Sequence, residues 1–165
     1  MEQILTALDA LQLKSPRMIT IPPEATLAEA IEKMIEYNIG AILVKEGDEI
    51  IGIWTERDHL RNTLMPGYDP KTNRIGDSMQ TVLHSAPADT SIMALQDIFL
   101  GLFIRHIMIV DEGKYIGLLS IGDVIRAALL QKDREIKELH QMASWEYYEN
   151  WGWDRKHRSK KKEQE

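Results

Sequence analysis

The sequence repeats itself at an offset of 65 residues. Residues 51–61 read IGIWTERDHLR, and residues 116–126 read IGLLSIGDVIR. At this offset residues 14–61 align with residues 79–126 without a gap, and seven of the 48 pairs are identical: Pro22/Pro87, Ile39/Ile104, Ile42/Ile107, Ile51/Ile116, Gly52/Gly117, Asp58/Asp123 and Arg61/Arg126. Such an internal repeat predicts one supersecondary unit built twice. Because one unit is too small for a secure core, we expect the two units to share one.

Residue class along the two repeats predicts the order of their elements. LAEAIEKMIEY (27–37) aligns with IMALQDIFLGL (92–102), and both place apolar residues at i, i+3, i+7 and i+8, which is helical spacing. AILVKEGDEIIGIW and HIMIVDEGKYIGLL each hold two apolar runs around a turn with Gly and acidic residues, which is typical of a hairpin. Each repeat, 13–62 and 75–127, therefore reads β-α-β-β-α. The fold class is mixed α/β (α+β), with a linker at 63–74 that contains Pro-Gly and Asp-Pro.

These features resemble a known family. The element order, the paired G-h-x-[ST]-x-x-D ends (h is apolar) and the phrase IRHIMIVDEGKYIGLLSIGDVI are similar to a tandem pair of cystathionine-β-synthase (CBS) domains, the Bateman module. The resemblance covers about residues 13–127, and the first repeat resembles the leading repeat of stand-alone bacterial CBS-pair proteins. It implies a pseudo-twofold module whose cleft carries up to two adenine-nucleotide sites. It also implies a homodimer, for which the apolar helix 92–103 would suit an interface.

Each repeat ends in a hydroxyl followed three residues later by an aspartate: Thr55 with Asp58, and Ser120 with Asp123. One interpretation is a capping box, in which the hydroxyl and the carboxylate cap the start of a helix reciprocally. The other is a ribose site, because a carboxylate fixed in a first helical turn can accept hydrogen bonds from a vicinal diol. The two interpretations are compatible, and the resemblance favours ribose binding by both aspartates.

Basic residues differ between the repeats. Arg105 and His106 precede the central strand of the second repeat, where the resemblance places a phosphate-contacting residue; the alternative for Arg105 is a surface residue at the start of a strand. Their counterparts in the first repeat are Gly40 and Ala41, which carry no charge. Arg57 either substitutes for the missing cation or is solvated. We therefore expect two unequal sites, with the Asp123 site the more complete.

Two further positions depart from the family pattern. Where the family often has a hydroxyl late in the first strand, this chain has Ile19 and His84. Ile19 would suit the face of an adenine ring. His84 is either a structural or solvated residue or a ligand of the nucleotide.

The two ends of the chain lie outside the repeats. Residues 1–12 predict a helix docked on the module, with an apolar face of Ile4, Leu5, Leu8 and Leu11. A second helix is expected over 128–150, docked rather than in a coiled coil because its heptad pattern is poor. Residues 144–154 (SWEYYENWGWD) gather three of the four Trp, which we expect to pack on the body, on a dimer mate or on a partner. The basic tail, 151–165, is expected to be disordered.

Composition restricts the function. The chain has no cysteine, which excludes disulfides and thiol chemistry, and we see no nucleotide-hydrolase, protease or metal motif, so we expect no enzyme, no metal and no catalytic cofactor. The net charge is −6 although the tail is basic, so we do not expect nucleic-acid binding. We see no signal peptide or membrane span, and expect a cytoplasmic protein.

The predicted function is regulatory. We expect the protein to bind an adenosyl ligand (AMP, ADP, ATP, NAD or S-adenosylmethionine) and to act on an unidentified effector protein. The alternative is an interaction scaffold with vestigial sites.

Overall fold

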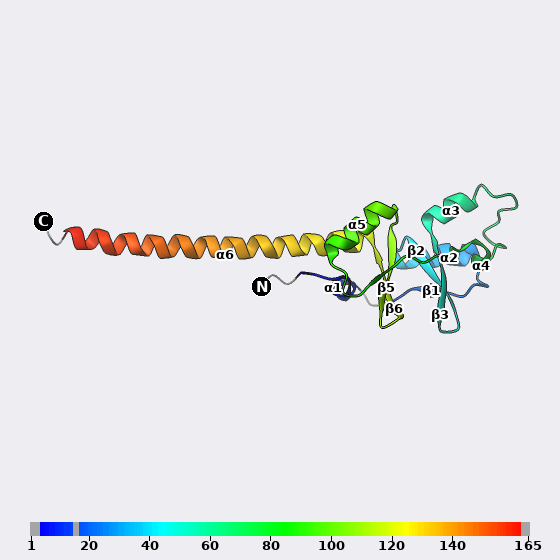
Figure 1. Ribbon diagram of the computed structural model, residues 1–165. Coiled ribbons are helices and arrows are strands. Elements are labelled where there is room, and N and C mark those ends of the chain that lie inside the picture. Colours follow the sequence, from blue (N-terminus) through cyan, green and yellow to red (C-terminus); the bar gives the residue numbers. More distant parts are fainter. Residues whose placement is uncertain (1–3, 15–16, 163–165) are drawn as a thin grey trace.

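The chain folds into two α/β repeats from which one long helix projects (Figure 1). The computed structural model of the protein describes residues 4–14 and 17–162, with side chains up to Ala143. The elements are α1 (Ala7–Leu13), β1 (Thr20–Ile21), α2 (Leu27–Tyr37), β2 (Ala41–Glu46), β3 (Glu49–Thr55), α3 (Glu56–Asn62), α4 (Ile75–Ser78), β4 (Ser85–Pro87), α5 (Ile92–Leu102), β5 (His106–Asp111), β6 (Lys114–Ser120) and α6 (Ile121–Lys162).

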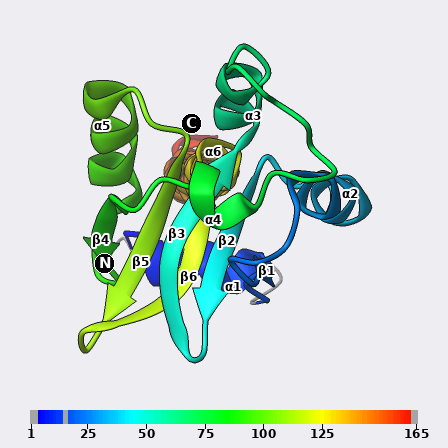
Figure 2. The same ribbon diagram turned by 90° about the vertical axis from the view of Figure 1, so that its right-hand side faces the viewer.

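The 65-residue offset reappears element by element. Helices α2 and α5 begin and end at equivalent positions, as do the hairpins β2–β3 and β5–β6. Each repeat forms its own three-stranded sheet, in which the first strand pairs parallel with the second and the second pairs antiparallel with the third. The strands of both sheets lie between α5 on one side and α2 and α3 on the other (Figure 2). The predicted mixed α/β fold with two pseudo-symmetric β-α-β-β-α repeats is confirmed.

The repeats do not share one core, although their small size led us to expect one. The first repeat encloses its own apolar cluster around Trp54, Leu27 and Ile42, and the second encloses another around Phe99, Leu95 and Ile107. What joins the repeats is an exchange of the segments that precede β1 and β4. We call these the leading segments, residues 4–14 and 75–80.

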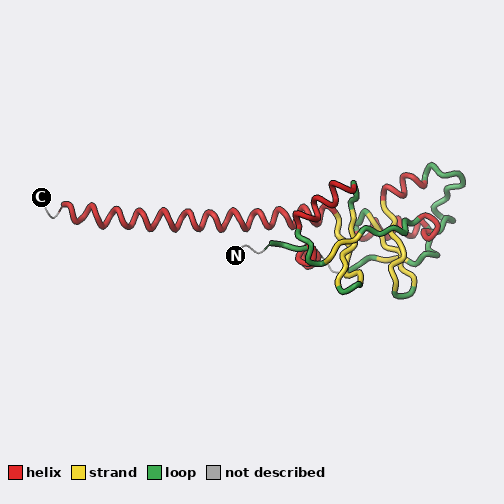
Figure 3. The backbone as a smooth tube through the Cα atoms, viewed as in Figure 1, coloured by secondary structure: helices red, strands yellow, loops and turns green. Residues whose placement is uncertain are grey.

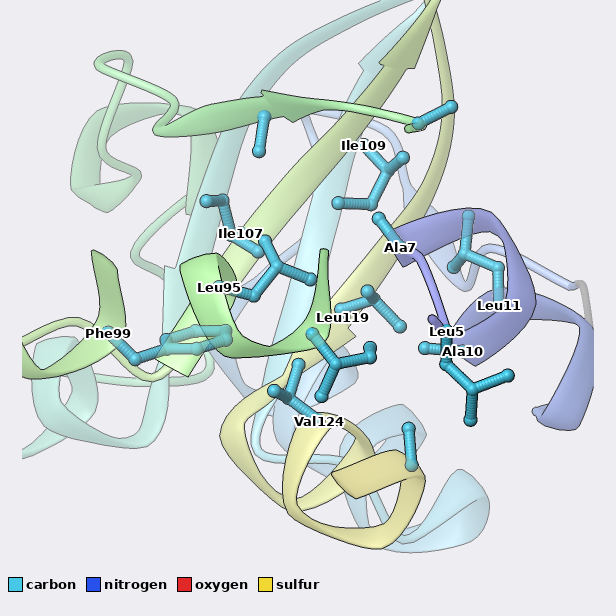
Figure 4. Close-up of a cluster of buried hydrophobic side chains, with 14 residues drawn as sticks. Leu5, Ala7, Ala10, Leu11, Leu95, Phe99, Ile107, Ile109, Leu119 and Val124 are labelled. Atoms are coloured by element: carbon cyan, nitrogen blue, oxygen red, sulfur yellow. The ribbon is translucent and has the colours of Figure 1, made fainter. Parts of the chain in front are cut away.

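The exchange is reciprocal. The first leading segment contributes Leu5, Ala7, Ala10 and Leu11 to the cluster of the second repeat (Figure 4). The second leading segment contributes Ile75 to the cluster of the first repeat. Its Gln80 also exchanges two backbone hydrogen bonds with Ile53 of β3, at 2.8 and 2.9 Å. Each repeat is therefore completed by the segment that precedes the first strand of the other repeat.

This exchange explains why the Ile-Gly pair occurs twice. A Cβ atom at Gly117 would lie 2.6 Å from Leu11 Cδ2, and a Cβ atom at Gly52 would lie 2.9 Å from Met79 Cγ. Leu11 and Met79 belong to the two leading segments. Glycine is needed at both positions because a leading segment fills the space into which any other side chain would project.

The N-terminal helix is docked on the module, but it is shorter than predicted. Thr6 accepts a hydrogen bond from the Asp9 backbone N–H and Asp9 caps back, so α1 begins at Ala7 rather than at the chain start. The expected apolar face is correspondingly wrong in part, since Leu5 and Leu11 are buried whereas Ile4 and Leu8 are exposed. Residues 1–3 lie outside the described residues.

The C-terminal helix differs most from the prediction. Helix α6 continues from Ile121 to Lys162, so the helix boundary expected near residue 150 is wrong, and so is the disorder expected for residues 151–162. Residues 163–165 lie outside the described residues. A lone Gly152 does not stop the helix, because glycine costs only about 1 kcal/mol in a helix interior. The helix also does not dock beyond its first turns: it leaves the body as a single rod (Figures 1 and 3). The Trp side chains in this region lie outside the described residues. No described helix is long and apolar enough to cross a membrane.

Candidate functional site

A cleft of about 220 Å³ lies between the two repeats. We call it the first cleft. It brings together six of the nine predicted site residues: Thr55, Arg57, Asp58, His84, Arg105 and His106. Apolar side chains from both repeats complete the lining, among them Ile53, Ile104, Met108 and Leu118. Ser120, Asp123 and Ile19 do not line it.

Asp58 is the buried acid of the first cleft, with 5% of its surface exposed. Its Oδ2 atom accepts hydrogen bonds from the Thr55 backbone N–H at 2.9 Å and from the Thr55 hydroxyl at 2.8 Å. These contacts form the predicted capping box of α3. The other oxygen, Oδ1, accepts a hydrogen bond from Gln80 Nε2 at 2.6 Å. One carboxylate oxygen thus caps the helix while the other is directed to the leading segment of the second repeat.

Three arginines line the first cleft, two from α3 (Arg57 and Arg61) and one that precedes β5 (Arg105). Arg57 is not simply solvated, because its NH1 atom donates a hydrogen bond to the Phe103 carbonyl at 3.2 Å. This bond joins α3 of the first repeat to the end of α5 in the second. The three arginines outnumber the two acids of the lining, Glu56 and Asp58, although the chain as a whole is acidic. Guanidinium groups are suited to phosphate because they donate two parallel hydrogen bonds.

His106 lies between the cleft and the start of α6. Burial, together with the positive charges of Lys14 and Arg105, lowers the pKa of His106 to about 4, while the negative charge of Asp123 opposes the shift. The imidazole is therefore neutral at neutral pH, and it can donate or accept a hydrogen bond without adding charge to the cleft.

The depressed pKa of His106 predicts acid sensitivity. Since an unfolded chain has the ordinary His pKa near 6.5, the unfolded state binds more protons between pH 6.5 and 4, and stability falls as the pH drops through that range. We expect the wild-type protein to lose up to about 3 kcal/mol relative to a His106→Gln variant between these pH values. Urea unfolding of both proteins from pH 7 to 4, without ligand, measures the difference. Parallel curves would contradict it.

A second, smaller cleft of about 80 Å³ occupies the pseudo-symmetric position. Its lining includes Ile19, Ile39, Ala41 and Leu43, which are the counterparts at the 65-residue offset of His84, Ile104, His106 and Met108 in the first cleft. We call it the second cleft. Ser120 and Asp123 do not line it, although their counterparts Thr55 and Asp58 line the first cleft.

Asp123 does not line the second cleft but forms an ion pair with Lys14. Lys14 Nζ lies 2.8 Å from Asp123 Oδ2, which also accepts hydrogen bonds at 2.8 Å from the Ser120 backbone N–H and from the Ser120 hydroxyl. Burial tends to raise the pKa of Asp123, but the hydrogen bonds from Lys14 and Ser120 outweigh burial and lower it. Our expectation that Arg105 completes a stronger Asp123 site therefore differs from the structure, in which Arg105 lines the cleft of Asp58 and not the second cleft.

Sequence reasoning missed Lys14, Gln80 and Arg61. Arg61 carried a signal, because it is identical to Arg126 in the repeat alignment. Lys14 and Gln80 carried none, since they lie in irregular segments before the first strand of each repeat. Within the part of the chain that the structure describes, no group of His, Asp and Glu side chains is arranged to hold a metal ion.

Comparison with known proteins identifies the family. The family model for the CBS domain matches residues 10–61 and 75–130. The chain is 32% identical over 120 residues to the mitochondrial CBS domain-containing protein CBSX3 of Arabidopsis thaliana, and the match covers 70% of this chain but 58% of CBSX3. A CBS-domain protein from Burkholderia ambifaria has a similar solved structure, with 30% identity and a TM-score of 0.72 over 76% of this chain and 95% of that one. The crystal structure of CBSX2 in complex with AMP is also similar, with 25% identity and a TM-score of 0.62 over 77% and 98% of the two chains. The chain belongs to the CBS domain family and contains two such domains.

Proposed function

We propose that this CBS pair binds an adenosyl ligand in the first cleft and acts as a regulatory module without chemistry of its own. One observation carries the proposal: a buried carboxylate, apolar side chains and three arginines from both repeats line a single cleft. These are the three groups that a nucleotide needs, for its ribose, its base and its phosphates.

The roles follow from the chemistry of the side chains. Asp58 Oδ1 accepts one hydrogen bond from Gln80, and a ribose hydroxyl could take the place of that amide. Ile53, Ile104 and Met108 offer an apolar surface to the adenine ring. Arg57, Arg61 and Arg105 supply the positive charge for phosphate. CBSX2, whose structure is known with AMP, supports this class of ligand.

A ligand at the arginines would also change the contact between the repeats. Arg57 donates to the Phe103 carbonyl across the cleft, and Phe103 holds a left-handed φ of 53° that a bulky residue adopts only at a cost. A phosphate would compete with that carbonyl for Arg57. Release of Phe103, which is 81% exposed, would alter a surface that an effector protein could detect.

Calorimetry with AMP, ADP, ATP, NAD and S-adenosylmethionine tests the proposed function. We expect at least one of them to bind at the first cleft and to raise the melting temperature, because a ligand that binds only the folded state stabilises it. Failure of all five to bind would favour the alternative, an interaction scaffold. The exposed apolar side chains of α6, among them Leu129, Ile136 and Leu139, are the observation that supports that alternative.

We further propose that the protein is a homodimer joined through α5. Its buried residues Ile92, Leu95 and Phe99 face the core, yet Met93 and Leu100 are each 68% exposed, and large exposed apolar groups on one helix favour a partner surface. Light scattering should give twice the chain mass of 19.0 kDa, and Leu100→Glu should give the monomer mass. Leu64→Glu, at an 87% exposed linker residue, is the control that should stay dimeric. A wild-type monomer at micromolar concentration would contradict the proposal.

A further inference from the structure

Lys14 lines the second cleft and forms an ion pair with Asp123, the counterpart of the aspartate that lines the first cleft. Its Nζ atom lies 2.8 Å from Asp123 Oδ2 and 3.1 Å from the Leu118 carbonyl oxygen. Both partners belong to the end of the second repeat, whereas Lys14 closes the leading segment of the first. The side chain of Asp123 is only 13% exposed beneath this contact.

The first cleft shows what differs. Lys14 aligns with Met79 at the 65-residue offset, and Met79 is an uncharged side chain packed near Gly52. The donor that reaches Asp58 from the leading segment is the neutral amide of Gln80. Both donors meet an ionised carboxylate, but the ammonium of Lys14 adds a charge–charge attraction at 2.8 Å that the amide of Gln80 lacks. The cation near Asp58 is Arg61, whose NH1 atom lies farther away, at 3.6 Å from Oδ1, on a side chain that is 71% exposed. A ribose hydroxyl, itself neutral, can replace an amide far more easily than it can replace an ammonium ion.

The protein holds Lys14 in place. Its backbone N–H donates to the Leu11 carbonyl at 3.2 Å, and Leu11 packs over Gly117. Helix α1 is fixed in turn by backbone hydrogen bonds from Ala7 to Thr90 at 2.8 Å and from Leu8 to Ala88 at 2.9 Å. Because the segment is already ordered, the ion pair forms with little further loss of chain entropy.

We infer that the ion pair of Lys14 with Asp123 keeps this carboxylate from binding a ribose. The pair thereby closes the second cleft to adenosyl ligands and restricts the chain to one nucleotide, at the first cleft. The inference rests on the proposed function, which it makes specific. Lys14 is therefore the residue that sets the stoichiometry of the module, and it does so without touching the nucleotide.

Calorimetric titration with AMP tests this inference on the full chain. The wild type should bind one AMP per chain, and Asp58→Asn should weaken that binding at least tenfold while Lys45→Met, a surface control, leaves it unchanged. Lys14→Met installs the side chain of the equivalent Met79 and should raise the stoichiometry to two. The added equivalent should be lost again in the Lys14→Met, Asp123→Asn double variant.

Lys14→Arg separates charge from shape, because it keeps the cation and should stay at one AMP per chain. Circular dichroism melting shows whether each variant is folded, and if Lys14→Met unfolds, Lys14→Gln replaces it with the amide that serves at Gln80. Two AMP per wild-type chain, or one in folded Lys14→Met and Lys14→Gln, would overturn the inference and leave the proposed function standing. If none of these proteins binds AMP, the inference is overturned. If the other four ligands also fail to bind, the proposed function is overturned as well.

Discussion

An Asp58→Asn variant is expected to fold normally and to bind AMP at least tenfold more weakly than the wild type. The carboxylate is placed in the first turn of α3 and buried in the first cleft, where it accepts two hydrogen bonds from Thr55 and one from Gln80. Loss of a hydrogen bond to a charged group costs about 1.5–3 kcal/mol, which corresponds to roughly 10- to 100-fold in the dissociation constant.

The folded state tolerates the change because its neighbours can adapt. The side-chain oxygen of the introduced asparagine would still accept from Thr55 and cap the helix, while its NH₂ group would face Gln80. The amide of Gln80 can turn by about 180° and present its oxygen instead of its nitrogen. We expect a loss of about 1 kcal/mol in the free energy of unfolding, mainly from the missing charge at the helix start.

Glu29→Gln is the matched control. Glu29 has the same capping role at α2, where it accepts hydrogen bonds from the Thr26 backbone N–H and hydroxyl at 2.7 and 3.0 Å, and it does not line the first cleft. It should lose similar stability and no AMP affinity. In addition, the wild type should prefer AMP to 2′-deoxy-AMP, and Asp58→Asn should discriminate less. Equal AMP binding by Asp58→Asn and wild type would show that Asp58 is only a cap.

The fold within each repeat could be predicted because its signals are local and periodic. The apolar stripe of α2 and α5, the turns of the two hairpins and the hydroxyl–aspartate pair each lie within about a dozen residues of sequence. The alignment of two copies doubled every signal. Helix starts were also predictable, since Thr55 and Ser120 cap α3 and α6 as expected.

The partnership between cations and carboxylates could not be predicted. Arg105 and Asp123 lie in the same repeat, so the sequence suggested one site, but the cleft that Arg105 lines is formed with Asp58 of the other repeat. Lys14 reaches Asp123 across 109 positions from the C-cap of α1, and the apolar spacing of that helix does not tell which acid its last residue meets. Only the tertiary packing of the two repeats and their leading segments decides these contacts, and the periodicity of a single sequence carries no signal for it.

A Trp54→Ala variant is expected to lose about 3–5 kcal/mol of unfolding free energy, because a large, fully buried side chain leaves a cavity that the structure fills only in part. Trp54 is at the centre of the apolar cluster of the first repeat. Its indole Nε1 donates a hydrogen bond to Asn62 Oδ1 at 2.9 Å, and its ring meets His59 edge-on at a centroid distance of 5.6 Å. It thereby fixes α3, the helix that carries Asp58.

The exchange of leading segments decides whether the Trp54→Ala variant unfolds in one step or in two. The two apolar clusters are separate, so independent repeats would unfold in two steps once the first was weakened. However, each repeat is completed by a segment of the other, so we expect one cooperative transition with a lower midpoint. Urea unfolding followed by far-ultraviolet circular dichroism measures it, with Trp54→Phe as the smaller change that keeps an aromatic ring but loses the bond to Asn62. Two resolved transitions in Trp54→Ala would show that the exchanged segments do not couple the repeats.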